Sequence, residues 1–221
     1  MKRFVAVVLF ASLNTFGTHA TAKGITIGPL PAISNASPKL KKSLRALWAR
    51  IESDAKECTE NAKGMDSVAN YRSSVKKMIE TSKVVVLQVS ASMICDGVHS
   101  SSYRYGIAFE KASGTRLDLS RVYNIATRVD GRLFIRPELV NSVKSSYRKA
   151  SRDNQSCLSA TGWEDEIANL PITFSPLPDG SIVLYYVAPD VSAACFPALP
   201  LEPEVFVKFR DANQASRYEL P

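Results

Sequence analysis

The stretch KVVVLQVSASMIC, from Lys83 to Cys95, carries the clearest structural signal in the chain. Its apolar residues occupy every second position, namely Val85, Leu87, Val89, Ala91, Met93 and Cys95. This alternation, rich in β-branched residues, predicts a strand with one buried face. A second strand is predicted from Tyr103 to Phe109, where aromatic and aliphatic residues again alternate. Both strands are expected to belong to a mostly antiparallel sheet.

Helices are predicted on both sides of these strands. Ser37-Pro38 is typical of a helix start, because serine is a favoured N-cap and proline a favoured first residue. The apolar stripe that follows has helical spacing and ends at a cysteine: Leu40, Leu44, Leu47, Trp48, Ile51, Ala55 and Cys58. We predict a second helix from Val68 to about Ser82 and a third from Pro137 to about Ala150. Cys157–Leu170 is ambiguous and favours a short helix that contains Trp163.

Shorter elements complete the expected fold. Ile25–Ile27 and Leu133–Ile135 favour short strands, and Val205–Phe209 favours a closing strand. Ile172–Phe174 and Ser181–Val187 flank the turn residues Leu177-Pro178-Asp179-Gly180, which predicts a hairpin. Helices and strands are segregated along the chain, which indicates an α+β fold with N-terminal and central helices packed on the sheet.

The N-terminus has the pattern of a cleavable signal peptide. Lys2 and Arg3 precede an apolar run from Phe4 to Leu13, which is too short for a permanent membrane span of about 20 residues. Small residues follow, and they allow cleavage after Ala20 or Ala22. We therefore predict a signal at residues 1–22 and a single α+β domain at 23–221, with its core at about 38–210. The expected location is periplasmic or secreted, without a transmembrane anchor.

The four cysteines, Cys58, Cys95, Cys157 and Cys195, suit an oxidising compartment. An even count predicts two disulfides, for which the sequence allows three pairings. We favour Cys58–Cys95 and Cys157–Cys195, because each pair joins neighbouring elements and closes a loop of similar length. No C-x-x-C pair is present, so the cysteines are not expected to bind a metal.

The positive charge is scattered rather than concentrated. The formal net charge of +7 falls to about +5 when Lys2 and Arg3 leave with the signal. The basic residues lack the aromatic interleaving of a single-strand nucleic-acid binder, so no nucleic-acid partner is expected. An anionic wall polymer or an acidic protein suits this charge better.

The order of several motifs resembles an envelope domain family. The first motif is Cys95-Asp96-Gly97-Val98-His99, where the family has C-G-G-A-H/Y; the second is Phe109 to Leu119, which contains a Gly114-Thr115 turn. The third is the hairpin from Phe174 to Tyr186 with Asp179-Gly180 at its turn, followed by Pro189 and Cys195. Together these motifs span most of residues 38–210.

This family occurs as the lysozyme-sensing ectodomain of a membrane-bound anti-sigma factor and attached to a peptidoglycan deacetylase. The sequence departs from its pattern at two places: Asp96-Gly97 replaces a Gly-Gly pair, and Glu110 replaces an aspartate. The resemblance implies a binding domain of the bacterial envelope.

Few residues suit catalysis. His99 is the one histidine beyond the signal, and a triad of His99 with Asp96 and a following serine would require adjacent residues to converge. Glu164 next to Trp163 suggests acid chemistry beside a sugar platform, but a run of acids is usually a solvated face. We therefore expect no catalytic residue, metal or cofactor, and take His99, Asp96, Trp163 and Glu164 as candidate binding residues.

The predicted function is a non-enzymatic, exported cell-envelope module that binds an envelope protein or peptidoglycan. One alternative is a cell-wall hydrolase or deacetylase. Another is a lysozyme-binding inhibitor or sensor, although a chain near +5 would repel lysozyme, a basic protein.

Overall fold

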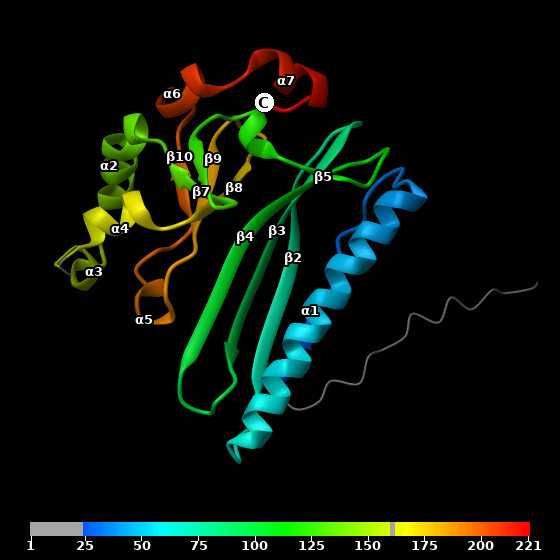
Figure 1. The fold of residues 1–221 in the computed structure, drawn as a ribbon, viewed down its shortest axis with the longest axis vertical. Helices are drawn as coiled ribbons and strands as arrows, with labels where there is room; N and C mark the ends of the chain where they lie inside the picture. The colour runs from blue at the N-terminus through cyan, green and yellow to red at the C-terminus, as the bar shows by residue number, and fades with distance from the viewer. Residues whose placement is uncertain (1–23, 160–161) are drawn as a thin grey trace, which may run out of the picture.

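The computed structural model describes residues 24–159 and 162–221, so the predicted signal at 1–22 lies outside the described residues. A first sheet contains five strands in sequence order: β1 (Ile25–Ile27), β2 (Asn70–Glu80), β3 (Val84–Ile94), β4 (Ser100–Glu110) and β5 (Arg116–Leu117). β1 pairs parallel with β2, and the other neighbours are antiparallel. As Figure 1 shows, β2, β3 and β4 are long and make up most of the first sheet.

A second, smaller sheet packs against the first. Its order is β10-β9-β8-β7-β6, and its strands are β6 (Ala126–Val129), β7 (Arg132–Ile135), β8 (Ile172–Pro176), β9 (Ile182–Tyr186) and β10 (Leu199–Leu201). All its pairings are antiparallel. The architecture is therefore α+β with mostly antiparallel sheets, as the sequence predicted.

Seven α-helices surround the sheets in the described part of the chain: α1 (Pro38–Gly64), α2 (Val140–Ala150), α3 (Gln155–Ser159), α4 (Trp163–Asn169), α5 (Asp190–Ala193), α6 (Pro203–Phe206) and α7 (Ala212–Tyr218). Short 3-10 turns lie at Leu119–Arg121, Pro137–Leu139 and Val207–Phe209. α1 runs along the first sheet, whereas the other helices gather around the second sheet (Figure 1). No helix among these described residues is long and apolar enough to cross a membrane.

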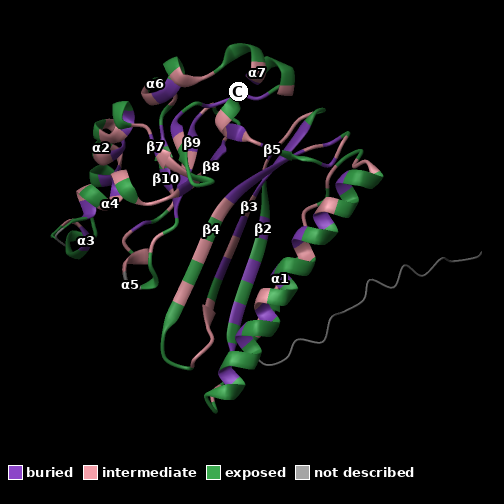
Figure 2. Ribbon diagram, in the orientation of Figure 1, coloured by how far each residue is buried: buried purple, intermediate pink, exposed green. Residues whose placement is uncertain are grey.

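The alternation in β3 builds two layers of core. Val85, Leu87 and Val89 pack with the buried stripe of α1, whereas Val84 and Val86 pack with the second sheet. Figure 2 shows the buried residues of α1 in regular steps along the helix, as expected when one stripe faces a sheet. The first sheet is therefore the middle layer between α1 and the second sheet.

The start of α1 forms as predicted. Ser37 is the N-cap, and its Oγ accepts a hydrogen bond of 3.1 Å from the Leu40 N–H. The same hydroxyl donates to the Lys111 carbonyl at 2.5 Å, which fixes the helix start to the turn between β4 and β5. Gly114 in that turn has φ +68°, and a Cβ there would lie 2.5 Å from the Lys39 carbonyl carbon. Glycine is required for this approach.

Both predicted disulfides are confirmed. Cys58 at the end of the α1 stripe is bonded to Cys95, with Cα atoms 4.7 Å apart. Cys157 is bonded to Cys195, with Cα atoms 5.3 Å apart. The first bond attaches the helix to the end of β3, and the second attaches α3 to the segment after α5. Together they fit an oxidising, non-cytoplasmic compartment.

Two predicted elements are wrong. The helix predicted at 68–82 is wrong, because Asn70–Glu80 within it form the strand β2. Tyr71, Val75 and Ile79 are spaced by four, which is compatible with a helical period or a strand period, and pairing with β3 selects the strand. The closing strand predicted at Val205–Phe209 is the helix α6 followed by a 3-10 turn. Pro203 favours this helix because its φ is preset for a first helical position.

Candidate functional site

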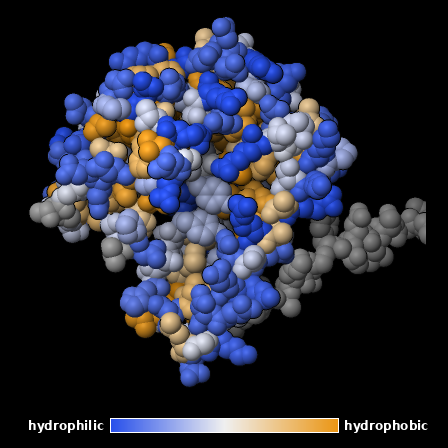
Figure 3. Space-filling view, viewed as in Figure 1, coloured by the Kyte–Doolittle hydropathy of each residue, from blue (hydrophilic) through white to orange (hydrophobic). Residues whose placement is uncertain are grey.

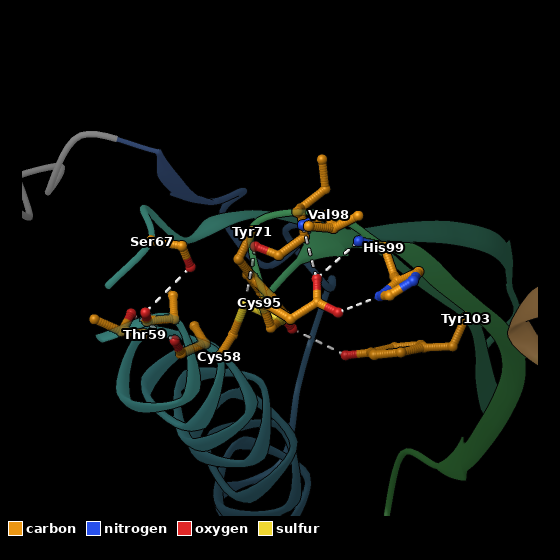
Figure 4. The surroundings of a disulfide bond; sticks show 12 residues. Cys58, Thr59, Ser67, Tyr71, Cys95, Val98, His99 and Tyr103 are labelled. Carbon is orange, nitrogen blue, oxygen red and sulfur yellow. Dashed lines mark hydrogen bonds and ion pairs between the residues drawn. A yellow bond between two sulfur atoms is a disulfide. The ribbon is translucent and has the colours of Figure 1, made fainter. Parts of the chain in front are cut away.

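The predicted pair Asp96 and His99 lies on the turn that connects β3 to β4. The Asp96 Oδ1 accepts hydrogen bonds from the N–H groups of Val98 and His99 at 3.0 and 2.8 Å, and its Oδ2 contacts His99 Nδ1. These bonds, first of all the one from Val98, hold the pKa of the Asp96 carboxyl well below its usual range. Figure 4 shows this turn beside the Cys58–Cys95 bond. Asp96 is thus an ionised carboxylate whose hydrogen bonds fix the turn.

The His99 side chain is 83% exposed, and none of its contacts in the described structure is a hydrogen bond to a serine hydroxyl. Ser101 and His99 do line a shallow hollow with Glu60 and Asp190. A triad would need a serine Oγ at the second ring nitrogen of His99. No group of three metal-ligating side chains lies close enough to hold an ion within residues 24–159 and 162–221.

Trp163 and Glu164 lie at the start of α4, where they stabilise helix packing. The Trp163 ring is 8% exposed, stacks on Tyr147 at 4.7 Å between centroids, and donates from Nε1 to the Leu158 carbonyl. Glu164 forms ion pairs with Arg148 and Lys144 at 2.5 and 3.4 Å. These contacts lower the pKa of the Glu164 carboxyl, with Arg148 the main cause.

The structure therefore brings together Asp96 and His99 but not the other two candidates. α4 packs beside the second sheet, whereas the β3–β4 turn lies at the far end of the long strands (Figure 1). The hollow beside His99 has neither Trp163 nor Glu164 in its lining. A cleft combining all the candidate residues is absent from the described structure.

A large concave surface with charged side chains follows β4, and we call it the β4 groove. It encloses about 830 Å³ between α1, the first sheet and the segment from Tyr185 to Ala198. Its lining includes Arg50, Arg72 and Arg104, together with Ser74, Ser90, Ser92, Ser102, Tyr103 and Tyr105. In Figure 3 the surface over β4 is hollowed, with rings at its floor and hydrophilic side chains beside them. Residues from both faces of β4 line the groove, so it wraps around the outer edge of this strand.

Strand register places the serines and arginines in rows. Arg72 of β2 pairs with Ser92 of β3, which pairs with Ser102 of β4. In the next row of this face, Ser74 pairs with Ser90, and Ser90 pairs with Arg104. Each row thus contains two serine hydroxyls and one guanidinium. The guanidinium is on β2 in the first row and on β4 in the second. The hydroxyls of Ser74 and Ser90 are 3.0 Å apart.

The arginines of the β4 groove lack ion-pair partners within the described residues. No carboxylate among the described residues forms an ion pair, with nitrogen and oxygen within 4.0 Å, with Arg50, Arg72 or Arg104. An arginine presents several N–H donors in a planar fork that matches a carboxylate or phosphate. Arg72 and Arg104 lie on the face of the sheet that is opposite α1, whereas Arg50 of α1 lies on the other side of β4. The lining also contains one carboxylate, Asp54, so arginines outnumber acids three to one and the groove is receptive to anions.

Tyrosines form the other wall of the groove. The rings of Tyr103 and Tyr105 stack at 5.9 Å, and Tyr103 donates a hydrogen bond of 3.0 Å to Asp54 of α1. Burial, followed by the hydrogen bond with Tyr71, raises the pKa of Tyr103. Burial also raises the pKa of Tyr105, although Arg50 and Arg116 oppose this. Both phenols therefore remain neutral at physiological pH, and their rings offer apolar surface beside Arg50, on the opposite face of β4 from Arg72 and Arg104.

The β4 groove does not follow from local patterns in the sequence. The sequence feature that corresponds to the groove is a set of polar residues that alternate with buried or half-buried positions in three strands. They are Arg72 and Ser74, Ser90 and Ser92, and Ser102 and Arg104. Alternation predicts that such residues face away from the α1 layer. It does not predict that the second sheet leaves them uncovered.

Comparisons with known proteins return distant structural neighbours. No family model matches the chain, and no curated protein matches it. Two solved structures of DUF3298 family proteins are structural neighbours. The one from Pseudomonas aeruginosa has a TM-score of 0.41 and 16% identity over 66% of this chain and 63% of its own. The one from Bacteroides fragilis has a TM-score of 0.48 and 12% identity over 81% of this chain and 67% of its own. The chain thus spans less than two thirds of the Pseudomonas protein.

Proposed function

We propose that this chain is a non-catalytic binding module of the bacterial cell envelope that holds an acidic cell-wall glycan in the β4 groove. The observation that carries the proposal is the row arrangement of unpaired Arg72 and Arg104 with serine hydroxyls on one concave face. Export to the envelope is part of the proposal, supported by the signal-like pattern of residues 1–22 and by the two disulfides.

A peptidoglycan fragment fits the chemistry of the groove. Its sugar hydroxyls would exchange hydrogen bonds with the serines, and its peptide carboxylates would pair with guanidinium groups. Where the fragment passes around the outer edge of β4, the apolar faces of its sugars would pack on the half-buried rings of Tyr103 and Tyr105, which are on the α1 side. The motif order that resembles the lysozyme-sensing and deacetylase-attached envelope domains also supports a ligand of the wall.

A sedimentation assay tests this function. Purified protein is mixed with insoluble peptidoglycan, and the bound fraction is measured before and after the wall carboxylates are amidated. We expect saturable binding that weakens with salt and falls on amidation, because charge pairing is lost. Equal binding to native and amidated wall would contradict the role given to the arginines.

The same incubation examines the hydrolase and deacetylase alternative. Mass spectrometry of the supernatant would show released or deacetylated fragments if the protein were such an enzyme. We expect unchanged fragments, because among the described residues the His99 ring is hydrogen-bonded to the Asp96 carboxylate and not to a serine hydroxyl.

Lysozyme binding is the remaining alternative. The unpaired arginines of the groove repel a basic protein, so we expect no recovery of the chain on immobilised lysozyme in low salt. Recovery there, together with no binding to peptidoglycan, would replace the proposed function by that of a lysozyme inhibitor or sensor.

A further inference from the structure

A second hollow, which we call the inter-sheet cavity, lies beyond the end of the β4 groove. It encloses about 700 Å³ between the β4–β5 edge of the first sheet and β7 and β8 of the second. The backbone N–H of Gly106 donates to Thr173 Oγ1 at 3.1 Å, so β4 contacts β8 where the two hollows meet. Val187 lines both.

The interior of the inter-sheet cavity is apolar. Its buried or half-buried apolar side chains are Ile107, Ala108, Leu117, Leu119, Leu133, Ile172 and Phe174, and half-buried Asp118, Ser120 and Thr173 supply a few polar groups. They come from both sheets, and most belong to the core layer between them. Pockets of this size with mostly apolar walls and a few polar groups are typical of small-molecule sites.

The rim of the cavity is basic. Arg116 of β5, Arg128 of β6 and Arg132 of β7 line it, and the three side chains are exposed. Arg128 is paired with Asp118 at 2.9 Å across the cavity mouth. Arg116 and Arg132 form no ion pair with any described residue.

The hairpin between β6 and β7 sets the position of two of these arginines. Its turn is Asp130-Gly131, with φ +48° and +78°, and Val129 pairs with Arg132 across it. This two-residue turn with both φ positive fits the natural strand twist. Arg128 also donates to the Gly131 carbonyl at 3.0 Å, which holds its guanidinium at the rim.

We infer that the inter-sheet cavity binds a small amphipathic anion, with an oxyanion head at Arg116 and Arg132 and an apolar body between the sheets. An acyl carboxylate and an alkyl phosphate share this chemistry. A neutral ligand would leave the guanidinium groups unpaired, and a purely hydrophilic anion would leave the apolar walls unused. This site is separate from the proposed wall-binding surface and does not depend on it.

Calorimetric titration with octanoate, octyl phosphate and octanol tests the inference. We expect the first two to bind and octanol to bind at least about 10-fold more weakly, because charge-assisted hydrogen bonds are lost. Tighter binding of octanoate than of octyl phosphate would identify an acyl carboxylate as the ligand class, and the reverse order would identify an alkyl phosphate. Octanol binding as tightly as octanoate, or octanoate failing to bind, would overturn the inference.

Variants of the full chain locate the site. Arg116→Gln with Arg132→Gln should weaken octanoate binding by about 10-fold or more. Lys42→Gln with Arg152→Gln removes the same charge from exposed positions outside the cavity and should leave binding unchanged. Equal losses in both double variants would mean a general charge effect and would overturn the assigned site.

A space-filling change supplies an independent test. Leu133→Trp should block the cavity, whereas Val129→Trp on the same hairpin, where Val129 is 54% exposed, should not. Thermal unfolding establishes that both variants fold. A folded Leu133→Trp variant that still binds octanoate with unchanged affinity would overturn the inference.

Discussion

Gly106 in β4 is in contact with the backbone of β8 next to Thr173, and this contact joins the two sheets. A Cβ at Gly106 would lie 2.3 Å from the Phe174 carbonyl oxygen and 2.5 Å from Ser175 Oγ. Neither neighbour can move freely, since one is backbone and Ser175 is fully buried. The absence of a side chain at Gly106 thus sets the spacing of the sheets.

Replacing this glycine should destabilise the protein. We expect Gly106→Ala to cost about 1–3 kcal/mol of unfolding free energy through overpacking. For a chain of this size that lowers the melting temperature by roughly 2–4 °C per kcal/mol. Gly64→Ala is the matched control, because a Cβ there meets nothing within 4 Å. Equal melting temperatures for the two variants would contradict this account of the sheet contact.

The disulfides should contribute similar stability. They join residues 37 and 38 positions apart in sequence, and loop-closure entropy gives each about 4 kcal/mol. Cys58→Ala with Cys95→Ala, and separately Cys157→Ala with Cys195→Ala, should each lose about this much in urea unfolding. A loss below about 1 kcal/mol in either would show that the closed loop is already constrained in the unfolded chain.

Glu80 should make stability depend on acid pH. Burial opposes ionisation of this carboxyl, but hydrogen bonds from Lys77, Lys111 and the Ser34 N–H outweigh it and lower its pKa to about 2. The lowered pKa stabilises the fold above the unfolded value near 4.5, and this stabilisation is lost as pH falls toward 2. Glu80→Gln should cost about 1.5–3 kcal/mol at pH 7 and have a smaller cost at pH 3.

Urea unfolding at both pH values checks this, with Glu57→Gln as the control because Glu57 is exposed and lacks an ion pair within the described residues. If Glu80→Gln cost the same unfolding free energy at pH 7 and at pH 3, ionised Glu80 would not be the cause of the pH-dependent stability.

Trp163 should matter for stability and not for wall binding. Trp163→Ala removes a buried ring stacked on Tyr147, so we expect a loss of about 3–5 kcal/mol. Affinity for peptidoglycan, measured where the variant is folded, should equal that of the unmodified protein. A weaker affinity with intact near-UV circular dichroism would instead support the sequence-based interpretation of Trp163 as a binding residue.

Local patterns explain how much of the fold the sequence could predict. The period of two in β3, the helical stripe of α1 and the shared buried face of Cys58 and Cys95 all follow from spacing, and all are confirmed. β6 was missed although Asp130-Gly131 is a strong hairpin signal, because the strand before it is short and half exposed. α7 was missed as well, although Asp211 caps it by accepting hydrogen bonds from Asn213 and Gln214.

The β4 groove could not be predicted in the same way. Arg72 and Arg104 lie on different strands and reach one face only through the register of each strand with β3. The groove also needs the segment after β9 to stand beside β4, and no local pattern encodes that placement. Asp96 and His99 were predicted as binding residues because aspartate and histidine are common in functional sites. Serines and arginines on a strand, by contrast, are typical of an ordinary solvent-exposed face.

The most direct measurement is the affinity of peptidoglycan for a variant with Arg72→Gln and Arg104→Gln. We expect a loss of about 10-fold or more and a weaker dependence on salt, because two guanidinium groups no longer pair with wall carboxylates. The variant with Lys42→Gln and Arg152→Gln, which carries the same net charge, should bind as the unmodified protein does. Unchanged affinity in the Arg72 and Arg104 variant, or an equal loss in both variants, would contradict the assignment of the β4 groove as the wall-binding site.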